Sequence, residues 1–304
     1  MTNINNLDTK NPILFTLENL SPIVSRQYGL LKNISRVRQY YDDIKYWHYS
    51  ATIDSNFARN DGHVFSSKSS GVSLISKEVA LVKCLGESIE RLCNHLFKND
   101  STILISSTKD INEPFVDPKS FASFSNKQLK NNKYKQFRIS DKSIFSWTDC
   151  YSLIDNHRYL VPSQLIYLSY PHLKDEPSIY PGISTGVAGG STIKSAIIRG
   201  LCEVVERDSF VIYYMNKITP KYIDLVSIKN RYLEKIVQDV KRYNFELKVF
   251  DLTTDIGIPV CASVLINKTG IGKAISLGLK CDFDPVKAII GSIEEALHTR
   301  SWVR

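Results

Sequence analysis

Three pairs of acidic or imidazole side chains occur in this sequence at a spacing of three residues. They are Glu87 and Glu90, Glu203 and Glu206, and Glu295 and His298. Residues three apart share one face of a helix, so the two members of each pair point the same way. Carboxylates are the oxygen ligands that Mg²⁺ uses beside nucleotide phosphates, and Glu-x-x-His pairs hold iron in helix bundles. The spacing therefore indicates a metal site and leaves two chemistries open.

The iron site is the weaker of the two interpretations. A di-iron bundle uses two Glu-x-x-His pairs, and the sequence has one, at Glu295 and His298. Strand-like segments also separate the three motifs, which a bundle does not allow. A purely structural alternative applies to Glu203 and Arg207, because an i,i+4 ion pair stabilises any helix by roughly 0.2–0.5 kcal/mol. We favour Mg²⁺ held by the carboxylates around the phosphates of a nucleotide.

Small residues precede two of the acidic motifs. The segments 69–73 and 184–192 are rich in Gly, Ser and Thr, and such segments let backbone N–H groups approach phosphate closely. Neither contains the lysine of a P-loop motif, so the expected nucleotide site is of another type. No serine lies in a G-x-S-x-G elbow and Cys202 is expected to face the core. Catalytic residues therefore remain unassigned, and the nucleophile is expected to come from the substrate.

The elements that position these residues follow from hydrophobic periodicity. Apolar residues at three- and four-residue steps predict helices at 77–97, from 193 onward after a cap at Ser191 or Thr192, at 227–243 and from 284 onward. Apolar and β-branched runs predict strands at 45–53, 104–105, 145–147, 246–251 and 258–266. They also predict a glycine-containing turn and strand at 270–279 and an extended segment at 160–170. The expected class is a mixture of helices and strands.

The first two acidic motifs stand at matching distances from glycine. Gly71 precedes Glu87 by 16 residues, and Gly186 precedes Glu203 by 17. Two copies of a Gly/Ser loop, a helix and Glu-x-x-Glu-Arg predict two equivalent helices that bring four carboxylates together.

Composition limits the kind of protein. The chain has 304 residues, a net charge of +8 and a pI near 9.0, which suggest an acidic partner. The Lys-rich run 126–135 has a single aromatic residue, so we interpret it as a solvated loop, and we do not expect nucleic-acid binding. Six cysteines without a C-x-x-C pair fit a reducing compartment. The N-terminal residues show no apolar core of a signal peptide, and no apolar run reaches the length that spans a membrane. We therefore expect a cytoplasmic protein that does not bind membranes.

The motifs together resemble those of the YcaO family. The resemblance rests on Ser184-Thr185-Gly186-Val187-Ala188-Gly189-Gly190-Ser191-Thr192, on 196–208 with Glu203, Glu206 and Arg207, on 86–91, on Gly257-Ile258-Pro259-Val260 and on 295–300. The sequence is most similar to cyclodehydratases of thiazole/oxazole-modified microcin and related bacteriocin pathways. The resemblance implies an α/β (α+β) YcaO-type fold with mixed sheets, packed helices and an internal pseudo-repeat. We expect a lead-in at 1–20 and the YcaO domain at 21–304, without the family's usual C-terminal segment.

The resemblance also implies an activity and its site residues. YcaO cyclodehydratases use ATP and Mg²⁺ to activate a peptide amide, onto which a Cys, Ser or Thr side chain closes. By this resemblance the metal ligands are Glu87, Glu90, Glu203, Glu206 and Glu295, and the ATP-binding residues are Ser184, Thr185, Glu87, Arg91, Glu203, Arg207 and His298. Expected partners are a precursor peptide, an adenylating-enzyme-like protein that binds its leader, and a second copy in a homodimer.

The sequence departs from the family pattern at three places along the chain. Gly71-Val72-Ser73 replaces Gly-Lys-Gly, Gly291 replaces an arginine, and His298 stands where glutamine is common. Related family members make thioamides or amidines with an external sulfide or amine, and a non-catalytic YcaO-like binding partner would keep the fold alone. These alternatives to azoline formation stay open at the level of the sequence.

Overall fold

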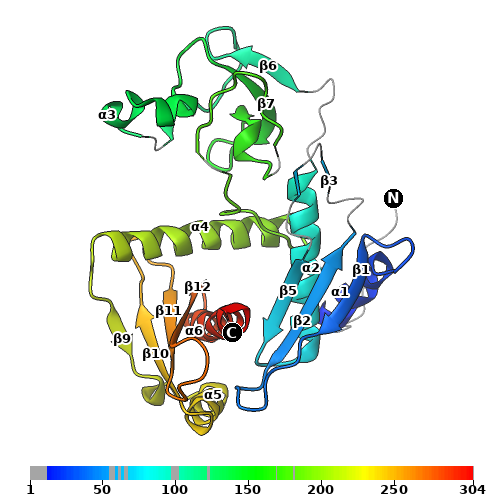
Figure 1. Cartoon of the computed structure of the whole chain (residues 1–304), viewed down its shortest axis with the longest axis vertical. Helices are drawn as coiled ribbons and strands as arrows, with labels where there is room; N and C mark the ends of the chain where they lie inside the picture. Colours follow the sequence, from blue (N-terminus) through cyan, green and yellow to red (C-terminus); the bar gives the residue numbers. More distant parts are fainter. Residues whose placement is uncertain are drawn as a thin grey trace. The chain divides into compact units, whose positions relative to one another are not determined.

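The computed structural model describes residues 12–54, 59–60, 63–64, 68–96, 103–121, 124–168, 170–180 and 182–303. The chain forms two compact units (Figure 1). Described residues of the first unit fall within Met1–Asp54, Lys68–Glu90 and Thr185–Arg304, and those of the second within Ser55–Ser67 and Arg91–Ser184. The first unit is therefore assembled from three separated stretches of chain.

The first unit contains a three-stranded antiparallel sheet with the order β1-β2-β5. Its strands are β1 (Leu31–Arg36), β2 (Trp47–Ile53) and β5 (Lys68–Ser73), preceded by α1 (Pro12–Leu20) and η1 (Ser21–Ile23) and followed by α2 (Lys77–His95). A Cβ atom on Gly71 would lie 2.2 Å from the Ala80 carbonyl oxygen and 2.3 Å from the Cys84 nitrogen. Glycine is needed there because the backbones of β5 and α2 meet directly.

The same unit contains a four-stranded antiparallel sheet with the order β12-β11-β10-β9. Its strands are β9 (Lys221–Ile223), β10 (Phe245–Asp251), β11 (Val260–Asn267) and β12 (Ile275–Cys281). The accompanying helices are α4 (Ile193–Met215), η5 (Leu225–Ser227), α5 (Arg231–Arg242) and α6 (Pro285–Val303). Helix α4 covers one face of this sheet, and α5 and α6 cover the other.

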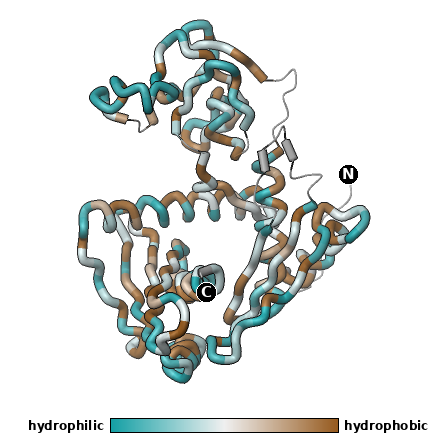
Figure 2. Tube along the Cα trace, viewed as in Figure 1, coloured by the Kyte–Doolittle hydropathy of each residue, from teal (hydrophilic) through white to brown (hydrophobic). Residues whose placement is uncertain are grey.

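Strand β11 is buried on both faces because successive side chains point in opposite directions. Val260 and Ala262 belong to the apolar cluster beneath α4, whereas Cys261 and Leu265 belong to the cluster around α6. Figure 2 shows hydrophobic stretches along these strands and along α6. The two-sided burial explains why β11 reads as a continuous apolar run in the sequence and not as an alternating one.

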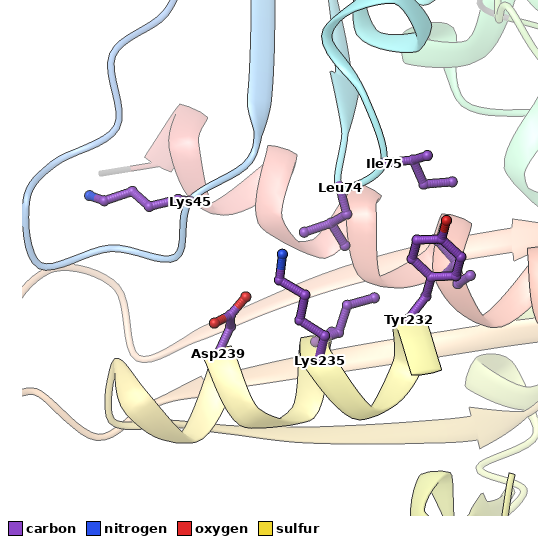
Figure 3. A pocket seen from close by; sticks show the side chains of 8 residues that line it. Lys45, Leu74, Ile75, Tyr232, Lys235 and Asp239 are labelled. Carbon is purple, nitrogen blue, oxygen red and sulfur yellow. The ribbon is translucent and has the colours of Figure 1, made fainter. Parts of the chain in front are cut away.

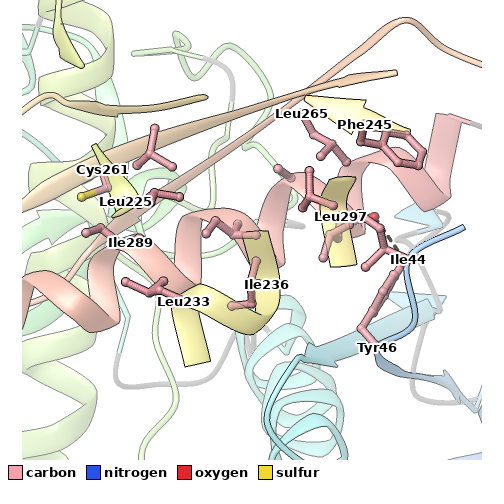
Figure 4. Close-up of a cluster of buried hydrophobic side chains, with 14 of the residues drawn as sticks. Ile44, Tyr46, Leu225, Leu233, Ile236, Phe245, Cys261, Leu265, Ile289 and Leu297 are labelled. Carbon is pink, nitrogen blue, oxygen red and sulfur yellow. Dashed lines mark hydrogen bonds between the residues drawn. The ribbon is translucent and has the colours of Figure 1, made fainter. Parts of the chain in front are cut away.

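Helix α6 lies at the centre of the larger core (Figure 4). Its Ile293 and Leu297 are buried in one cluster with Val72 of β5 and Leu265 of β11, so α6 contacts both sheets. The hydroxyl of Tyr46 donates to the Leu297 carbonyl oxygen at 3.2 Å. Burial of side chains of this size stabilises a fold by about 1.5–3 kcal/mol each, so α6 is the main connection between the sheets.

The expected pseudo-repeat takes an unexpected form. Gly278 of β12 meets α6 as Gly71 meets α2, since a Cβ atom on Gly278 would lie 2.2 Å from both the Ser292 oxygen and the Ala296 nitrogen. Each sheet thus ends in an edge strand with a buried glycine, and a helix follows directly. The sequence suggested α4 as the counterpart of α2, but the structure pairs α2 with α6. Helix α4 follows a loop and not an edge strand.

The second unit contains a three-stranded antiparallel sheet with the order β6-β7-β8. Its elements are β3 (Arg59–Asn60), β4 (His63–Val64), β6 (Leu104–Ser107), η2 (Pro118–Ser120), α3 (Asn126–Leu129), η3 (Asn132–Phe137), β7 (Ile144–Tyr151), β8 (Arg158–Pro162) and η4 (Ser163–Leu165). Phe145, Trp147, Leu160 and Ile179 form its core. The Trp147 indole N–H donates to the Ser106 carbonyl oxygen at 3.0 Å, which satisfies its polar group inside that core.

Most predicted elements are confirmed to within a few residues, and four segments differ. Of the extended segment expected at 160–170, only residues 160–162 belong to a strand, and Ser163–Leu165 forms η4. Residues 12–20, expected to be part of a loosely ordered lead-in, form α1, and residues 1–11 lie outside the described part. The segment 69–73 is not a loop, because it pairs with β2 as strand β5. The segment 126–135 is not a loop either, because it forms α3 and most of η3.

Candidate functional site

The loop before α4 is fastened to the start of that helix. Thr192 is the N-cap: its hydroxyl oxygen accepts from the Ser195 N–H at 3.1 Å, and the Ser195 hydroxyl oxygen accepts from the Thr192 N–H at 3.1 Å. A Cβ atom on Gly190 would lie 2.3 Å from the Ser195 hydroxyl oxygen and 2.5 Å from the Ala196 nitrogen, so the cap requires glycine at position 190. The predicted cap at Ser191 or Thr192 is therefore confirmed at Thr192.

The other end of this loop packs on the middle of α4. Gly186 has a φ of +88°, a backbone region that favours glycine. A Cβ atom on Gly200 would lie 2.5 Å from the Gly186 carbonyl oxygen. The loop thus lies against α4 one turn before Glu203, which brings its backbone groups near that carboxylate.

Glu90 joins the same loop to α2. Its Oε2 accepts from the Gly189 N–H at 2.8 Å, and the Arg199 guanidinium of α4 donates to the Gly189 carbonyl oxygen at 3.2 Å. The backbone of Gly189 is therefore held between an acidic and a basic side chain from two helices. This contact links the first predicted acidic motif to the second.

Glu203 stands in the middle of α4 among charges of both signs. Its Oε1 lies 3.8 Å from the Arg207 guanidinium nitrogen, the i,i+4 pair that the sequence suggested. Burial raises the pKa of the Glu203 carboxyl, the charge of Arg207 opposes this rise, and the charges of Glu206 and Glu90 add to it. The pair is thus real, but it does not neutralise the carboxylates around it.

Glu206 and Glu295 bind the open edge of β12. Strand β12 is an edge strand of its sheet, so the N–H groups on its outer side have no carbonyl oxygen of a neighbouring strand to donate to. The Cys281 N–H donates to Glu206 Oε2 at 2.8 Å, and the Leu279 N–H donates to Glu295 Oε2 at 3.0 Å. Two carboxylates, one from α4 and one from α6, are therefore aligned along a single strand.

These two carboxylates repel each other. Burial, followed by the negative charge of Glu206, raises the pKa of Glu295 to about 7. The hydrogen bond from the Leu279 N–H and the charges of Arg207 and Lys280 lower this pKa, but by less than burial and Glu206 raise it. A carboxylate with such a pKa lies in a place where an added positive charge would be strongly favoured.

Glu87 occupies the corresponding position at the edge of β5. The Ser70 N–H donates to Glu87 Oε2 at 3.0 Å, and the Ser70 hydroxyl lies 2.7 Å from His298 Nε2 of α6. Behind His298 the ring of His48 makes an edge contact at 5.1 Å. His48 is buried, and burial followed by the charge of His298 lowers its pKa to about 4, so that ring is neutral at pH 7.

The carboxylates share one feature that decides what the arrangement can do. Four of them each present an Oε2 atom to a backbone N–H, namely Glu87, Glu90, Glu206 and Glu295. Such bonds fix the orientation of a carboxylate without supplying a countercharge. Among the described residues, no three His, Cys, Asp or Glu side chains converge into a metal-binding group by themselves. A bound Mg²⁺ would therefore need further oxygen ligands, which fits its habit of sharing a few carboxylates with nucleotide phosphates.

Most of the predicted site residues have defined contacts in the structure. Hydrogen bonds or charge interactions connect Glu90, Glu203, Glu206, Glu295 and Arg207. Ser70 connects Glu87 to His298. Arg91 follows Glu87 by one turn of α2, and Ser184 and Thr185 begin the loop whose contacts come from Gly186 and Gly189.

Sequence reasoning missed the partners of the carboxylates. Ser70, Gly189, Leu279 and Cys281 contribute backbone N–H groups, which any residue type could supply. The useful signal was the glycine beside two of them, since Gly71 follows Ser70 and Gly278 precedes Leu279. It also missed Glu294, which accepts from the Leu74 N–H at 2.7 Å and pairs with Lys83 at 2.5 Å.

A separate small cavity in the first unit contains none of these residues. Its volume is about 50 Å³, and Lys45, Leu74, Tyr232, Lys235 and Asp239 are among the residues that line it (Figure 3). A space of that size holds a few water molecules. It is too small for a nucleotide.

Comparison with known proteins places the chain in a family. The sequence description of the YcaO cyclodehydratases, given as ATP- and Mg²⁺-binding, matches residues 74–304. The match includes α2, α4 and α6 and covers more than two thirds of the chain. The chain belongs to the YcaO family. The suspected relationship and the α+β class are thereby confirmed. The named strands pair antiparallel, whereas the resemblance implied mixed sheets.

Solved YcaO-type structures share the fold. A heterocyclase in complex with substrate and cofactor is 25% identical, with a TM-score of 0.81 over 96% of this chain and 40% of that chain. The heterocyclase TruD is 29% identical, with a TM-score of 0.61 over 70% and 32% of the two chains. YcaO from Methanopyrus kandleri, bound with AMPPCP and Mg²⁺, is 18% identical, with a TM-score of 0.65 over 94% and 67%.

Two curated relatives are themselves uncharacterized. One, encoded in the tfuA 3′ region of Rhizobium leguminosarum bv. trifolii, is 28% identical over 51% of this chain and 38% of its own length. The other, from Methanothermobacter thermautotrophicus, is 24% identical over 53% of this chain and 42% of its own length. The chain thus spans about two fifths of the length of these relatives.

A helix that spans a membrane must be both long and apolar. None of the helices that the structure describes combines the length and the apolar composition needed to cross a bilayer.

Proposed function

We propose that the chain uses ATP to activate backbone amides of a ribosomally made peptide and converts Cys, Ser or Thr residues into thiazolines or oxazolines. One observation carries the proposal: backbone N–H groups orient carboxylates from α2, α4 and α6, and burial beside the charge of Glu206 raises the pKa of Glu295 to about 7. Family membership and the likeness to heterocyclases support the choice of chemistry.

The proposed reaction proceeds by substrate attack. The thiol or hydroxyl of the substrate forms a bond to the preceding carbonyl carbon and loses its proton, which leaves an oxyanion. That oxygen takes the γ-phosphoryl group of ATP, and ADP leaves. The C–O bond then breaks with release of phosphate, and the amide nitrogen loses its proton to give the C=N bond of the azoline. The protein has no covalent step to perform, so positioning and charge neutralisation would suffice.

The residues of this chain receive the following proposed roles. Mg²⁺, when bound, would neutralise phosphate charge. Its proposed ligands are Glu87, Glu90, Glu203, Glu206 and Glu295. Proposed contacts to ATP come from Ser184, Thr185, Glu87, Glu203, Arg91, Arg207 and His298. Arg207 already lies beside Glu203, so it could orient that carboxylate and contact phosphate from the same position.

The proposed partners follow from the same chemistry. We propose a precursor peptide as substrate and an adenylating-enzyme-like protein that binds its leader. A homodimer is proposed as the assembly. A solved heterocyclase has been captured with its substrate, and McbBCD is a microcin synthetase complex seen with pro-MccB17 bound, which supports peptide substrates and companion proteins within this fold.

Calorimetry with AMPPCP and MgCl₂ tests the nucleotide part of the proposal. The wild-type chain should bind the nucleotide only when Mg²⁺ is present. Glu206→Gln removes one charge from the cluster while it keeps an oxygen for the Cys281 N–H, and it should weaken binding by about tenfold or more. Glu234→Gln, at an exposed position of α5, is the matched control. Absence of binding by the wild-type chain would favour a non-catalytic binding partner.

Mass spectrometry of a modified peptide tests the product. Loss of one water mass per ring, dependent on ATP, is the expected result for azoline formation. A mass change that corresponds to exchange of oxygen for sulfur would instead identify a thioamide-forming enzyme. A mass change that corresponds to addition of an amine with loss of one water would identify an amidine-forming enzyme.

A further inference from the structure

A short segment of the second unit holds most of the excess charge of the chain. Residues 118–140 contain six Lys or Arg and no Asp or Glu, so they contribute +6 of the net +8. Their central part is α3 (Asn126–Leu129), the turn at Lys130 and Asn131, and η3 (Asn132–Phe137), followed by Arg138. We call this segment, 124–138, the basic platform.

The basic platform is a built structure. Ser125 and Gln128 form a reciprocal cap at the start of α3, and the Asn131 side chain caps η3. The Arg138 side chain donates to the carbonyl oxygens of Leu129 at 2.6 Å, of Lys130 at 3.2 Å and of Asn131 at 3.4 Å. These bonds join the two helical turns, so the backbone positions that carry the lysines are fixed.

Aromatic side chains hold the platform from inside. The ring centroid of Phe124 lies 4.5 Å from that of Tyr134 and 4.8 Å from that of Phe137. All three rings are half-buried against one another. The Ser178 N–H donates to the Gln136 carbonyl oxygen at 2.7 Å, which ties the platform to a distant stretch of the same unit.

Four lysines of the platform lack acidic partners. Lys127, Lys130, Lys133 and Lys135 are all exposed, and in the part of the chain that the structure describes none of them has a carboxylate within ion-pair distance. Asp141 is engaged by Lys119 instead. Like charges gathered in a small area repel each other. Lys133 also contacts the Tyr134 ring, with its Nζ 5.8 Å from the ring centroid. An open hollow lined by Lys130 and Arg138 lies among them.

We propose that the basic platform binds an acidic segment of a polypeptide. Single-stranded nucleic acids are held by basic grooves with aromatic faces open for base stacking, and here the rings pack on one another. Phosphates favour the arginine fork, and the fork of Arg138 is occupied by carbonyl oxygens. Lysine ammonium groups act as point charges, which suits carboxylates spaced along a flexible chain. The choice of a peptide also draws on the proposed function, although the platform lies outside the proposed nucleotide site residues.

Fluorescence anisotropy with a labelled peptide that carries a run of glutamates tests the proposal. The full chain is compared with a variant carrying Lys127→Gln, Lys130→Gln, Lys133→Gln and Lys135→Gln. The matched control carries Lys221→Gln, Lys229→Gln, Lys241→Gln and Lys287→Gln, four exposed lysines of the first unit that remove the same charge. A labelled oligouridine and a glutamine version of the peptide serve as competing probes.

The platform variant should lose about tenfold or more in affinity for the acidic peptide, and the control variant about threefold or less. Equal losses in the two variants would overturn the proposal, because they would show an effect of net charge alone. Tighter binding of oligouridine than of the acidic peptide would also overturn it. Circular dichroism shows whether each variant is folded, and AMPPCP binding, measured separately, distinguishes failure of this proposal from failure of the nucleotide site.

Discussion

Glu295 is a residue whose buried charge destabilises the fold but suits the proposed site. Its pKa of about 7 lies above the ordinary value of 4.5, so the folded state holds a proton that the unfolded state releases between these values. Stability therefore falls as the pH rises from about 4.5 to 7, and the full cost is present above pH 7. A residue that destabilises the free protein at neutral pH is expected where a ligand supplies the missing charge.

Replacement of Glu295 by glutamine should make the free protein more stable at pH 8. Glutamine keeps an oxygen for the Leu279 N–H and removes the buried charge. The free energy of unfolding should rise by about 1–3 kcal/mol at pH 8, and the difference should vanish near pH 4.5. Urea unfolding at the two pH values measures this, with Glu234→Gln as the control. A loss of stability at pH 8 would mean that the Glu295 charge is compensated in the free protein.

The same carboxyl group should release a proton when nucleotide and metal bind. Near pH 7 Glu295 is partly protonated, and a cation beside it favours the ionised form. Calorimetry of AMPPCP binding with Mg²⁺ in buffers of different ionisation enthalpy should therefore show release of a fraction of a proton. Glu295→Gln should abolish that release. Equal release by the variant would assign the proton to another group.

At the scale of elements, the site consists of helices that close the edges of two sheets. Helices α2, α4 and α6 present carboxylates to N–H groups of β5, β12 and the loop before α4. An uncovered edge strand invites pairing with another chain, so the carboxylates also protect the fold. The structural and the functional interpretations of these residues are therefore compatible.

The sequence predicts the helices better than it predicts this arrangement. The three- and four-residue periodicity gives α2, α4 and α6, and Thr192 marks the start of α4. It does not predict β5, because Lys68–Ser73 is Ser-rich and becomes a strand through its pairing with β2. Nor does it predict that Glu206 and Glu295 share a strand, since their partners are backbone groups that carry no residue signature.

Glycine substitutions test the contact between β5 and α2. Gly71→Ala would place a Cβ atom 2.2 Å from the Ala80 carbonyl oxygen, so one backbone must move. We expect a loss of about 2–4 kcal/mol in the free energy of unfolding. Gly86→Ala in α2 is the matched control, because its Cβ atom would meet nothing within 4 Å. It should be neutral or stabilise the helix by about 0.5–1 kcal/mol.

Denaturant unfolding of both glycine variants gives the comparison directly. The stability of Gly71→Ala should fall and that of Gly86→Ala should not. Similar losses in the two variants would show that the contact between β5 and α2 is looser than the structure describes.

At the scale of the first unit, the acidic motifs come from two of the three chain segments that build it. Glu87 and Glu90 lie in Lys68–Glu90, whereas Glu203, Glu206 and Glu295 lie in Thr185–Arg304. Helix α6 holds these segments together through its core residues and through the Lys83–Glu294 pair. The +8 net charge gave no hint of this acidic cluster, because the basic platform dominates the sum.

A cation and a nucleotide together should therefore stabilise the chain by more than the sum of their separate effects. Mg²⁺ alone meets too few converging ligands among the described residues, and the nucleotide alone meets repelling carboxylates. Binding to the folded state raises stability by RT ln(1 + [L]/Kd), and coupling between two ligands is reciprocal. Thermal unfolding with AMPPCP plus MgCl₂ should give a rise in Tm greater than the sum of the rises with each ligand alone. Glu203→Gln should remove this excess, and the control Glu234→Gln should keep it. Additive shifts in the wild-type chain would contradict a shared site.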